Sequence, residues 1–209
     1  MKTIFSILLT TITLNCIAQN EKPGVVVAAD KMNVFYMGVD NPISISPGKS
    51  WKNTEVQIEG GTLSGTGSSR IVRVDKPGIV TLSVINQKDT SRFSFRTKEL
   101  PDPVFKIGSG KKRMPVVEFK AQQFCRADLE NFDFDLQIPV VSATVYAFIP
   151  QEGKENKVLS GQINGNSLTS INWMISQLCP GSSVVFEHII VRFPNGVVRE
   201  ISPATFALF

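Results

Sequence analysis

The chain of 209 residues is 42% hydrophobic and has a formal net charge of +4, with 22 basic against 18 acidic side chains. So small a positive excess argues against a nucleic-acid partner, because domains that bind phosphate backbones gather basic residues much more densely. The length allows one large β domain or two modest domains.

The first eighteen residues have the pattern of a secretory signal peptide. Lys2 precedes an apolar stretch at 4–14 and a small-residue end, Cys16-Ile17-Ala18, which predicts cleavage after Ala18. The stretch is shorter than the roughly twenty apolar residues of a spanning helix. We therefore expect an exported protein, periplasmic or extracellular, that does not span a membrane. Acylation at Cys16 is the less favoured alternative.

Residues 24–98 are predicted to form an immunoglobulin-like β-sandwich. Apolar and polar residues alternate at 71–74 and 92–96, and Asp40-Asn41-Pro42 and Asp75-Lys76-Pro77-Gly78 are turn signals. About seven short strands without a convincing helix are typical of this sandwich. We expect these strands at 25–28, 33–37, 43–46, 55–58, 70–74, 79–85 and 91–97.

A linker with two prolines, residues 99–103, separates this domain from a second one at 104–209. The second domain is predicted to be mostly β with two short helices. Apolar residues at helical spacing place the helices at 116–128 and 168–178. Asn195-Gly196 is a strong hairpin signal. We expect the strands at 132–136, 141–149, 158–163, 184–193, 197–201 and 204–208.

Cys125 and Cys179 remain after Cys16 is removed with the signal peptide. An even pair of cysteines in an exported protein favours a disulfide. Two buried free thiols are the alternative, because unpaired cysteine behaves as a small hydrophobic residue.

No pattern in the sequence indicates a catalytic, cofactor or metal site. His188 is the only histidine, which excludes multi-histidine metal centres. The basic turn at 107–113 lacks the spacing of a phosphate-binding loop. Four acidic residues lack the regular spacing of a calcium loop, and two of them are expected on the outer face of a strand. They are Asp128, Glu130, Asp133 and Asp135. We expect a protein that is not an enzyme and holds no cofactor.

Several segments, in this order, carry a resemblance to a known family. They are residues 31–43, the joint at 100–104, Ile107-Gly108 with Lys111-Lys112, residues 129–135, and the closing pattern of Gly181, Val184, Phe186 and Pro194-Asn195-Gly196. Together they resemble the C-terminal periplasmic region of the GldM family over about residues 28–208. That region is an immunoglobulin-like domain followed by the family's C-terminal domain.

The resemblance implies a component of the type IX secretion and gliding machinery of Bacteroidetes-type bacteria. In that family a dimeric shaft reaches from an inner-membrane motor shared with GldL to a ring of GldK and GldN. The resemblance implies that this chain is a non-enzymatic periplasmic protein that binds a GldK- or GldN-like protein. Whether it also forms a homodimer is left open. A cleavable signal in place of the family's transmembrane helix departs from the pattern.

The candidate partner contacts are polar turns, an outward strand face and one tryptophan. They are Asp40, Asn41, Lys111, Lys112, Arg113, Asp133, Asp135 and Trp51. Two other functions stay open. An adhesin module that binds carbohydrate or a cell surface would need an exposed aromatic such as Trp51, and an envelope hydrolase would need converging carboxylates.

Overall fold

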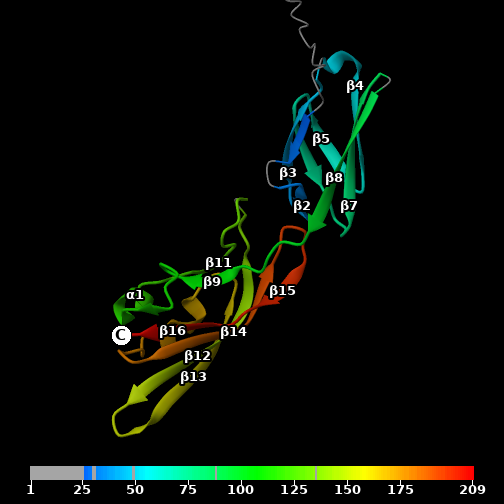
Figure 1. Ribbon diagram of the computed structural model, residues 1–209. Helices are drawn as coiled ribbons and strands as arrows, with labels where there is room; N and C mark the ends of the chain where they lie inside the picture. The colour runs from blue at the N-terminus through cyan, green and yellow to red at the C-terminus, as the bar shows by residue number, and fades with distance from the viewer. Residues whose placement is uncertain (1–25, 30–31, 49, 88, 135) are drawn as a thin grey trace, which may run out of the picture.

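The computed structural model describes residues 26–29, 32–48, 50–87, 89–134 and 136–209. The expected signal peptide, Cys16 and Asp135 lie outside these residues. Two β lobes follow one another along the chain and are joined by the connection at 99–103 (Figure 1). No helix within the described residues is long and apolar enough to cross a membrane.

The N-terminal lobe is a sandwich of two four-stranded sheets. One sheet has the order β1-β3-β6-β5 and the other the order β2-β8-β7-β4, with only β2 and β8 parallel. The strands are β1 (Val26–Ala29), β2 (Val34–Tyr36), β3 (Asn41–Ser46), β4 (Thr54–Glu59), β5 (Thr62–Thr66), β6 (Ser69–Arg73), β7 (Ile79–Asn86) and β8 (Asp89–Lys98), with a 3-10 turn η1 (Trp51–Asn53) before β4.

Alternating side chains build the core between these sheets. In β3, Ile43 and Ile45 are buried while the residues between them are exposed, which is the period of two expected for a half-buried strand. The rings of Phe35 and Phe95 stack at 4.4 Å between centroids. The predicted immunoglobulin-like sandwich is thus confirmed, and all seven predicted strands are present. The eighth strand, β5, has no apolar alternation that would predict it, because it is polar and almost wholly exposed.

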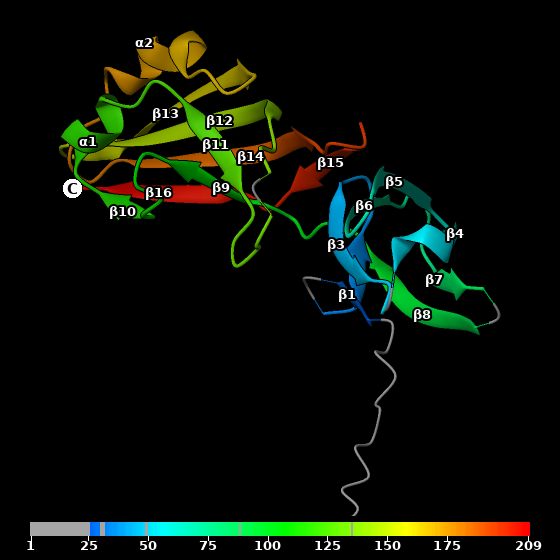
Figure 2. The ribbon, with the colours of Figure 1, turned by 90° about the horizontal axis from the view of Figure 1, so that it is seen from above.

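The C-terminal lobe is built on a six-stranded sheet of order β10-β16-β14-β12-β13, with β15 paired to β14, and on a separate β9-β11 pair. Figure 2 shows α2 lying over the β12–β13 side of this sheet. The elements are β9 (Val104–Ile107), β10 (Arg113–Met114), α1 (Val116–Lys120), β11 (Cys125–Asp128), β12 (Val140–Gln151), β13 (Lys154–Asn164), η2 (Thr169–Ile171), α2 (Asn172–Ile175), β14 (Ser183–Arg192), β15 (Val198–Ile201) and β16 (Ala204–Leu208).

Aromatic side chains fill the core of this lobe. Phe105 lies 4.7 Å from Phe186 and 6.4 Å from Phe206 between ring centroids, and Phe119 contacts Phe206 at 5.9 Å. The predicted helix at 168–178 is shorter than expected and divides into η2 and α2. Its predicted apolar face is nonetheless buried in full: Leu168, Ile171, Ile175 and Leu178 are each at most 5% exposed.

The predicted helix at 116–128 is wrong beyond Lys120. Of its expected apolar stripe, Val117 and Phe124 are 78% and 63% exposed, whereas Val116 and Phe119 are buried. The chain leaves the helix after one turn, and the residues at 125–128 pair with β9 as strand β11. Tertiary pairing therefore overrides the local helical pattern.

The predicted strand at 132–136 is also wrong within the residues described. Phe132 and Phe134 pair with no neighbouring strand, and their rings stack on each other at 5.2 Å. Both rings contact Tyr36 of the N-terminal lobe instead. The alternating apolar residues therefore form a contact between the lobes and not a strand of a sheet.

The favoured disulfide is not formed, and both cysteines are free. Cys125 lies buried in β11, where its Sγ contacts the carbonyl of Asn166 at 3.3 Å. Cys179 follows α2, with its Sγ 3.6 Å from Ser182 Oγ. Each sulfur thus has its own local contact, and the alternative of two unpaired thiols is the one observed.

Candidate functional site: a cleft between the lobes

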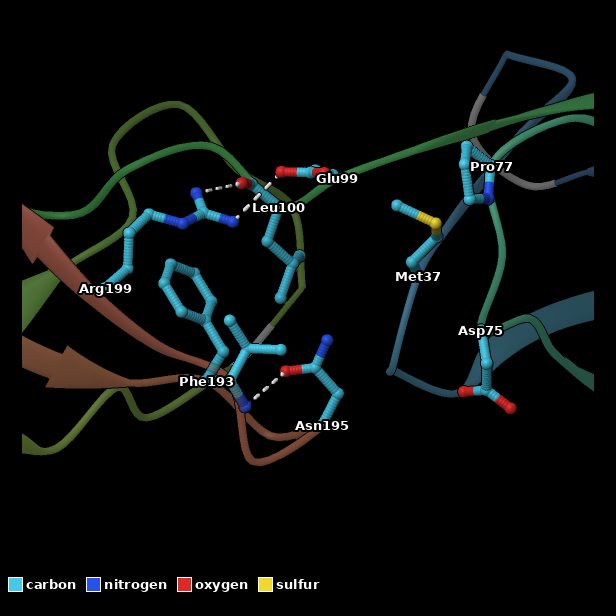
Figure 3. Close-up of a pocket in the computed structure, with 9 residues that line it drawn as sticks. Met37, Asp75, Pro77, Glu99, Leu100, Phe193, Asn195 and Arg199 are labelled. Carbon is cyan, nitrogen blue, oxygen red and sulfur yellow. Dashed lines mark hydrogen bonds and ion pairs between the residues drawn. The ribbon is translucent and has the colours of Figure 1, made fainter.

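A cleft of about 330 Å³ lies where the two lobes meet. We call it the interlobe cleft. Figure 3 shows Met37, Asp75 and Pro77 of the N-terminal lobe on one side and side chains of the linker and C-terminal lobe on the other. The latter are Glu99, Leu100, Phe193, Asn195, Val197 and Arg199.

The β14–β15 turn closes the bottom of the cleft against the turn after β2. Asn195 Oδ1 accepts a hydrogen bond of 3.1 Å from the Val197 N–H, which shapes this turn. Gly38 lies directly opposite with φ +76°, and a Cβ built on it would be 2.4 Å from the Cβ of Asn195. Only glycine allows the two backbones to approach so closely in this conformation.

Arg199 of β15 ties the linker to the C-terminal lobe. Its guanidinium donates to the Leu100 carbonyl at 3.2 Å and to Asp102 at 2.6 Å, and it lies 3.1 Å from Glu99. Its Cζ also lies 4.3 Å from the centroid of the Phe193 ring. This combination of fork-like hydrogen bonds and ring contact requires arginine and not lysine.

An aromatic contact provides a further junction between the lobes. Tyr36 meets the edges of Phe132 and Phe134 with centroid distances of 4.7 and 5.6 Å. Val39 belongs to the buried core of the C-terminal lobe although it lies in the N-terminal half of the chain. The turn after β2 is therefore packed against both lobes.

Among the described residues, Asp75 is one of two exposed carboxylates that line the interlobe cleft. Its side chain forms no ion pair or hydrogen bond within the part of the chain that the structure describes. Glu99, by contrast, is paired with Arg199. The cleft thus combines apolar side chains with an excess of negative charge.

The two predicted contacts at the first turn have different surroundings. Asn41 is 2% exposed and donates to the carbonyls of Tyr36, Val39 and Val72 at 2.9–3.2 Å. Its Oδ1 accepts from the Tyr36 N–H at 2.7 Å. Asn41 therefore holds the turn and offers no surface to a partner. Asp40 is exposed and forms an ion pair of 2.8 Å with Arg73.

The predicted basic turn is only partly free. Lys112 donates to the Phe105 carbonyl at 3.1 Å, and its Nζ lies 4.8 Å from the centroid of Phe206. Burial is the main cause that lowers the pKa of Lys112 below its usual value. Arg113 stacks over Phe209 at 5.3 Å, and Lys111 is exposed. The ammonium of Lys112 thus has contacts within the fold, although the residue is exposed.

Trp51 is half-buried and packs against the core of the N-terminal lobe, with the Arg70 guanidinium 5.6 Å from its ring centroid. It does not form the open aromatic platform that a carbohydrate site would need.

The acidic residues are also partly neutralised. Lys106 lies 3.5 Å from Asp128 and 3.1 Å from Glu130, and Arg126 lies 2.8 Å from Asp128. Asp133 is exposed and has an interaction of its own. No group of acidic, histidine or cysteine residues suited to a metal ion occurs within the described ranges.

Sequence reasoning does not identify the residues of the interlobe cleft as a site. The signals at 75–78 and 194–196 predict turns and nothing more. Arg199 has no local signal, because its partners are 97 to 100 positions away. Turns that meet from separate lobes can be identified only in three dimensions.

The chain matches two families of protein domains, one after the other along the sequence. Residues 24–99 match the GldM third domain, and residues 101–208 match the GldM C-terminal domain. The comparison with curated proteins gave no match.

Among solved structures, the chain is similar to the Yersinia pseudotuberculosis adhesin InvE and to the D0-D1 domain of intimin. InvE is 12% identical with a TM-score of 0.27; the match covers 88% of this chain and 58% of InvE. The intimin domain is also 12% identical, with a TM-score of 0.26; the match covers 87% of this chain and 97% of the intimin chain. The chain thus spans somewhat more than half of the InvE structure. The two domain matches cover nearly all the described residues, and the chain therefore belongs to the GldM family, of which it contains the third and the C-terminal domain.

Proposed function

We propose that this protein is a non-enzymatic interaction component of a gliding or type IX secretion apparatus, comparable to the distal end of the GldM shaft. The observation that carries this proposal is the match of two consecutive GldM domains over residues 24–208. Its partner is a cell-envelope protein similar to GldK or GldN, met in the periplasm.

The contacts between the lobes support a role in presenting a fixed surface. The Tyr36 cluster and the Gly38 contact join the lobes directly, and the Arg199 network holds the linker to the C-terminal lobe. A binding surface composed of both lobes keeps its shape only if the lobes are held together, because ordering them on binding would cost affinity.

The alternative of a carbohydrate-binding adhesin is less well supported, because Trp51 is half-buried under Arg70. A hydrolase is less well supported, because Asp128 and Glu130 are both ion-paired with Lys106.

The test is affinity capture of the tagged mature chain from an envelope extract of its own cells, followed by mass spectrometry. We expect recovery of a GldK- or GldN-like ring protein. Two exposed valines provide matched variants: Val197 lines the cleft and is 47% exposed, and Val158 on β13 is 55% exposed. Capture should be lost in Val197→Asp and retained in Val158→Asp. Recovery of no ring protein by the unmodified chain would contradict the proposed function.

A further inference from the structure

A second hollow on the N-terminal lobe adjoins the interlobe cleft. This hollow has a volume of about 500 Å³ and lies between the turn at Gly60-Gly61 and the segment 75–80. Asp75 and Pro77 line both hollows and form the ridge that separates them. We call the two hollows, with Asp75 and Pro77 between them, the ridge groove.

Apolar side chains are accessible on both sides of the ridge. Met37 is partly exposed and Val197 is 47% exposed in the interlobe cleft, and Ile79 is 70% exposed in the second hollow. A bound segment that covers accessible apolar side chains removes them from water, which makes binding more favourable.

The cation in the lining of the interlobe cleft already forms ion pairs. Arg199 is held by Glu99 and Asp102 at 3.1 and 2.6 Å. These three side chains carry a net charge of −1, and Asp75 adds a further negative charge without a partner in the described part of the chain.

Two cations line the second hollow. Arg73 is paired with Asp40 at 2.8 Å, whereas Lys76, the neighbour of Asp75, has no ion pair among the described residues; neither of them lines the interlobe cleft. The interlobe side of the ridge groove therefore carries the negative charge of Asp75, and apolar side chains are accessible on both sides of the ridge.

We infer that the ridge groove binds an extended segment of a partner protein in which a lysine or arginine lies between two apolar side chains. The cation contacts Asp75, and the apolar side chains enter the two hollows. In an extended chain, every second side chain lies on the same face, so the recognised pattern is apolar-x-basic-x-apolar, about 13 Å long. The inference rests on the proposed function, because it names the chemistry of the partner protein.

The test is an NMR titration of the full mature chain with the peptide acetyl-Val-Ser-Arg-Ser-Val-amide. A second peptide with citrulline in place of arginine keeps the shape and removes the charge. We expect chemical-shift changes at Met37, 75–79 and Val197. The citrulline peptide should bind about 1.4-fold to fivefold more weakly, the range measured for exposed ion pairs.

Two variants locate the contact. Asp75→Asn should reduce binding of the arginine peptide by the same factor and leave the citrulline peptide unchanged. Glu55→Gln, an exposed carboxylate of β4 in the same lobe, should change neither. Equal binding of both peptides, an unchanged affinity in Asp75→Asn, or shifts confined to other surfaces would overturn the inference.

Failure of this inference and failure of the proposed function give different results. If the unmodified chain and Asp75→Asn both capture a ring protein equally, the partner binds elsewhere and the inference fails alone. If the arginine peptide binds at Asp75 but the chain captures no ring protein, the groove is real and the gliding or secretion role is wrong.

Discussion

Gly38 and Asn195 meet across the junction between the lobes, so closely that a methyl group on Gly38 would lie 2.4 Å from the Cβ of Asn195. The two residues are far apart in sequence, and each lies in a turn. Their contact fixes the spacing of the walls of the interlobe cleft, because the β14–β15 turn cannot move closer and Gly38 cannot accept a side chain.

Replacing Gly38 by alanine should therefore separate the lobes. The new methyl group collides with Asn195, and alanine is strained at φ +76°, so we expect the free energy of unfolding to fall by about 2–4 kcal/mol. The measurement is urea unfolding, together with NMR relaxation of each lobe.

Gly153→Ala is the matched control, because Gly153 has φ +66° and no atom within 4 Å of the position that a Cβ would occupy. It should lose only the backbone contribution of about 1–2 kcal/mol. Adding Asn195→Gly to Gly38→Ala should restore part of the lost stability. Equal losses in Gly38→Ala and Gly153→Ala would show that the contact with Asn195 has no energetic weight.

Replacing Arg199 by lysine should loosen the linker and leave the C-terminal lobe folded. Lysine keeps the charge but cannot contact Leu100, Asp102 and Glu99 together while lying on Phe193. We expect a loss of about 1–3 kcal/mol and separate tumbling of the lobes in NMR relaxation.

Arg192→Lys is the control for this substitution, because Arg192 is exposed at the end of β14 and has no ion pair among the described residues. It should change the free energy of unfolding by less than about 0.5 kcal/mol. If Arg199→Lys leaves a single tumbling time for the whole chain, the linker is not held by this network.

Replacing Asn41 by alanine should destabilise the N-terminal lobe by about 2–3 kcal/mol. The change leaves the Tyr36 N–H and a set of buried carbonyls without their partner. Asp40→Asn removes an ion pair whose side chains are both more than half exposed, so its effect should stay within about 0.5 kcal/mol. Chemical denaturation of both variants measures the difference, and similar small losses would show that the hydrogen bonds of Asn41 contribute little to stability.

The sandwich can be predicted from sequence because its information is local. Each strand alternates against one core, and turn residues mark its ends, as in Ile43 and Ile45 of β3. The buried face of the second helix follows from the same reasoning, although its exact helical type does not.

The predictions fail where tertiary contacts decide the structure. Residues 125–128 have a helical pattern but pair with β9 as a strand. Phe132 and Phe134 have the spacing of a strand, but both contact Tyr36. The candidate site lies beyond local reasoning for the same reason: Asp75 and Arg199 come together only through the packing of the two lobes. The expectation of a surface Asn41 is wrong because a turn signal does not show burial.

The Cys125 thiol gives the protein a pH dependence that its sequence position does not suggest. Burial raises the pKa of Cys125 from 9.0 to about 12. Between these values the unfolded chain loses the thiol proton and the native chain keeps it, so ionisation favours the unfolded state. The stabilisation is complete below pH 9 and is lost as the pH rises, by up to about 1.4 kcal/mol per pH unit.

Unfolding free energies measured between about pH 8 and pH 10.5 should therefore fall more steeply for the unmodified chain than for Cys125→Ala. Comparing slopes removes the contribution of lysines and tyrosines, which both proteins share. Cys179→Ala is the matched control and should follow the slope of the unmodified chain, because it leaves the buried Cys125 thiol in place. Parallel slopes for the unmodified chain and Cys125→Ala would mean that the Cys125 thiol ionises in the native state as readily as in the unfolded one.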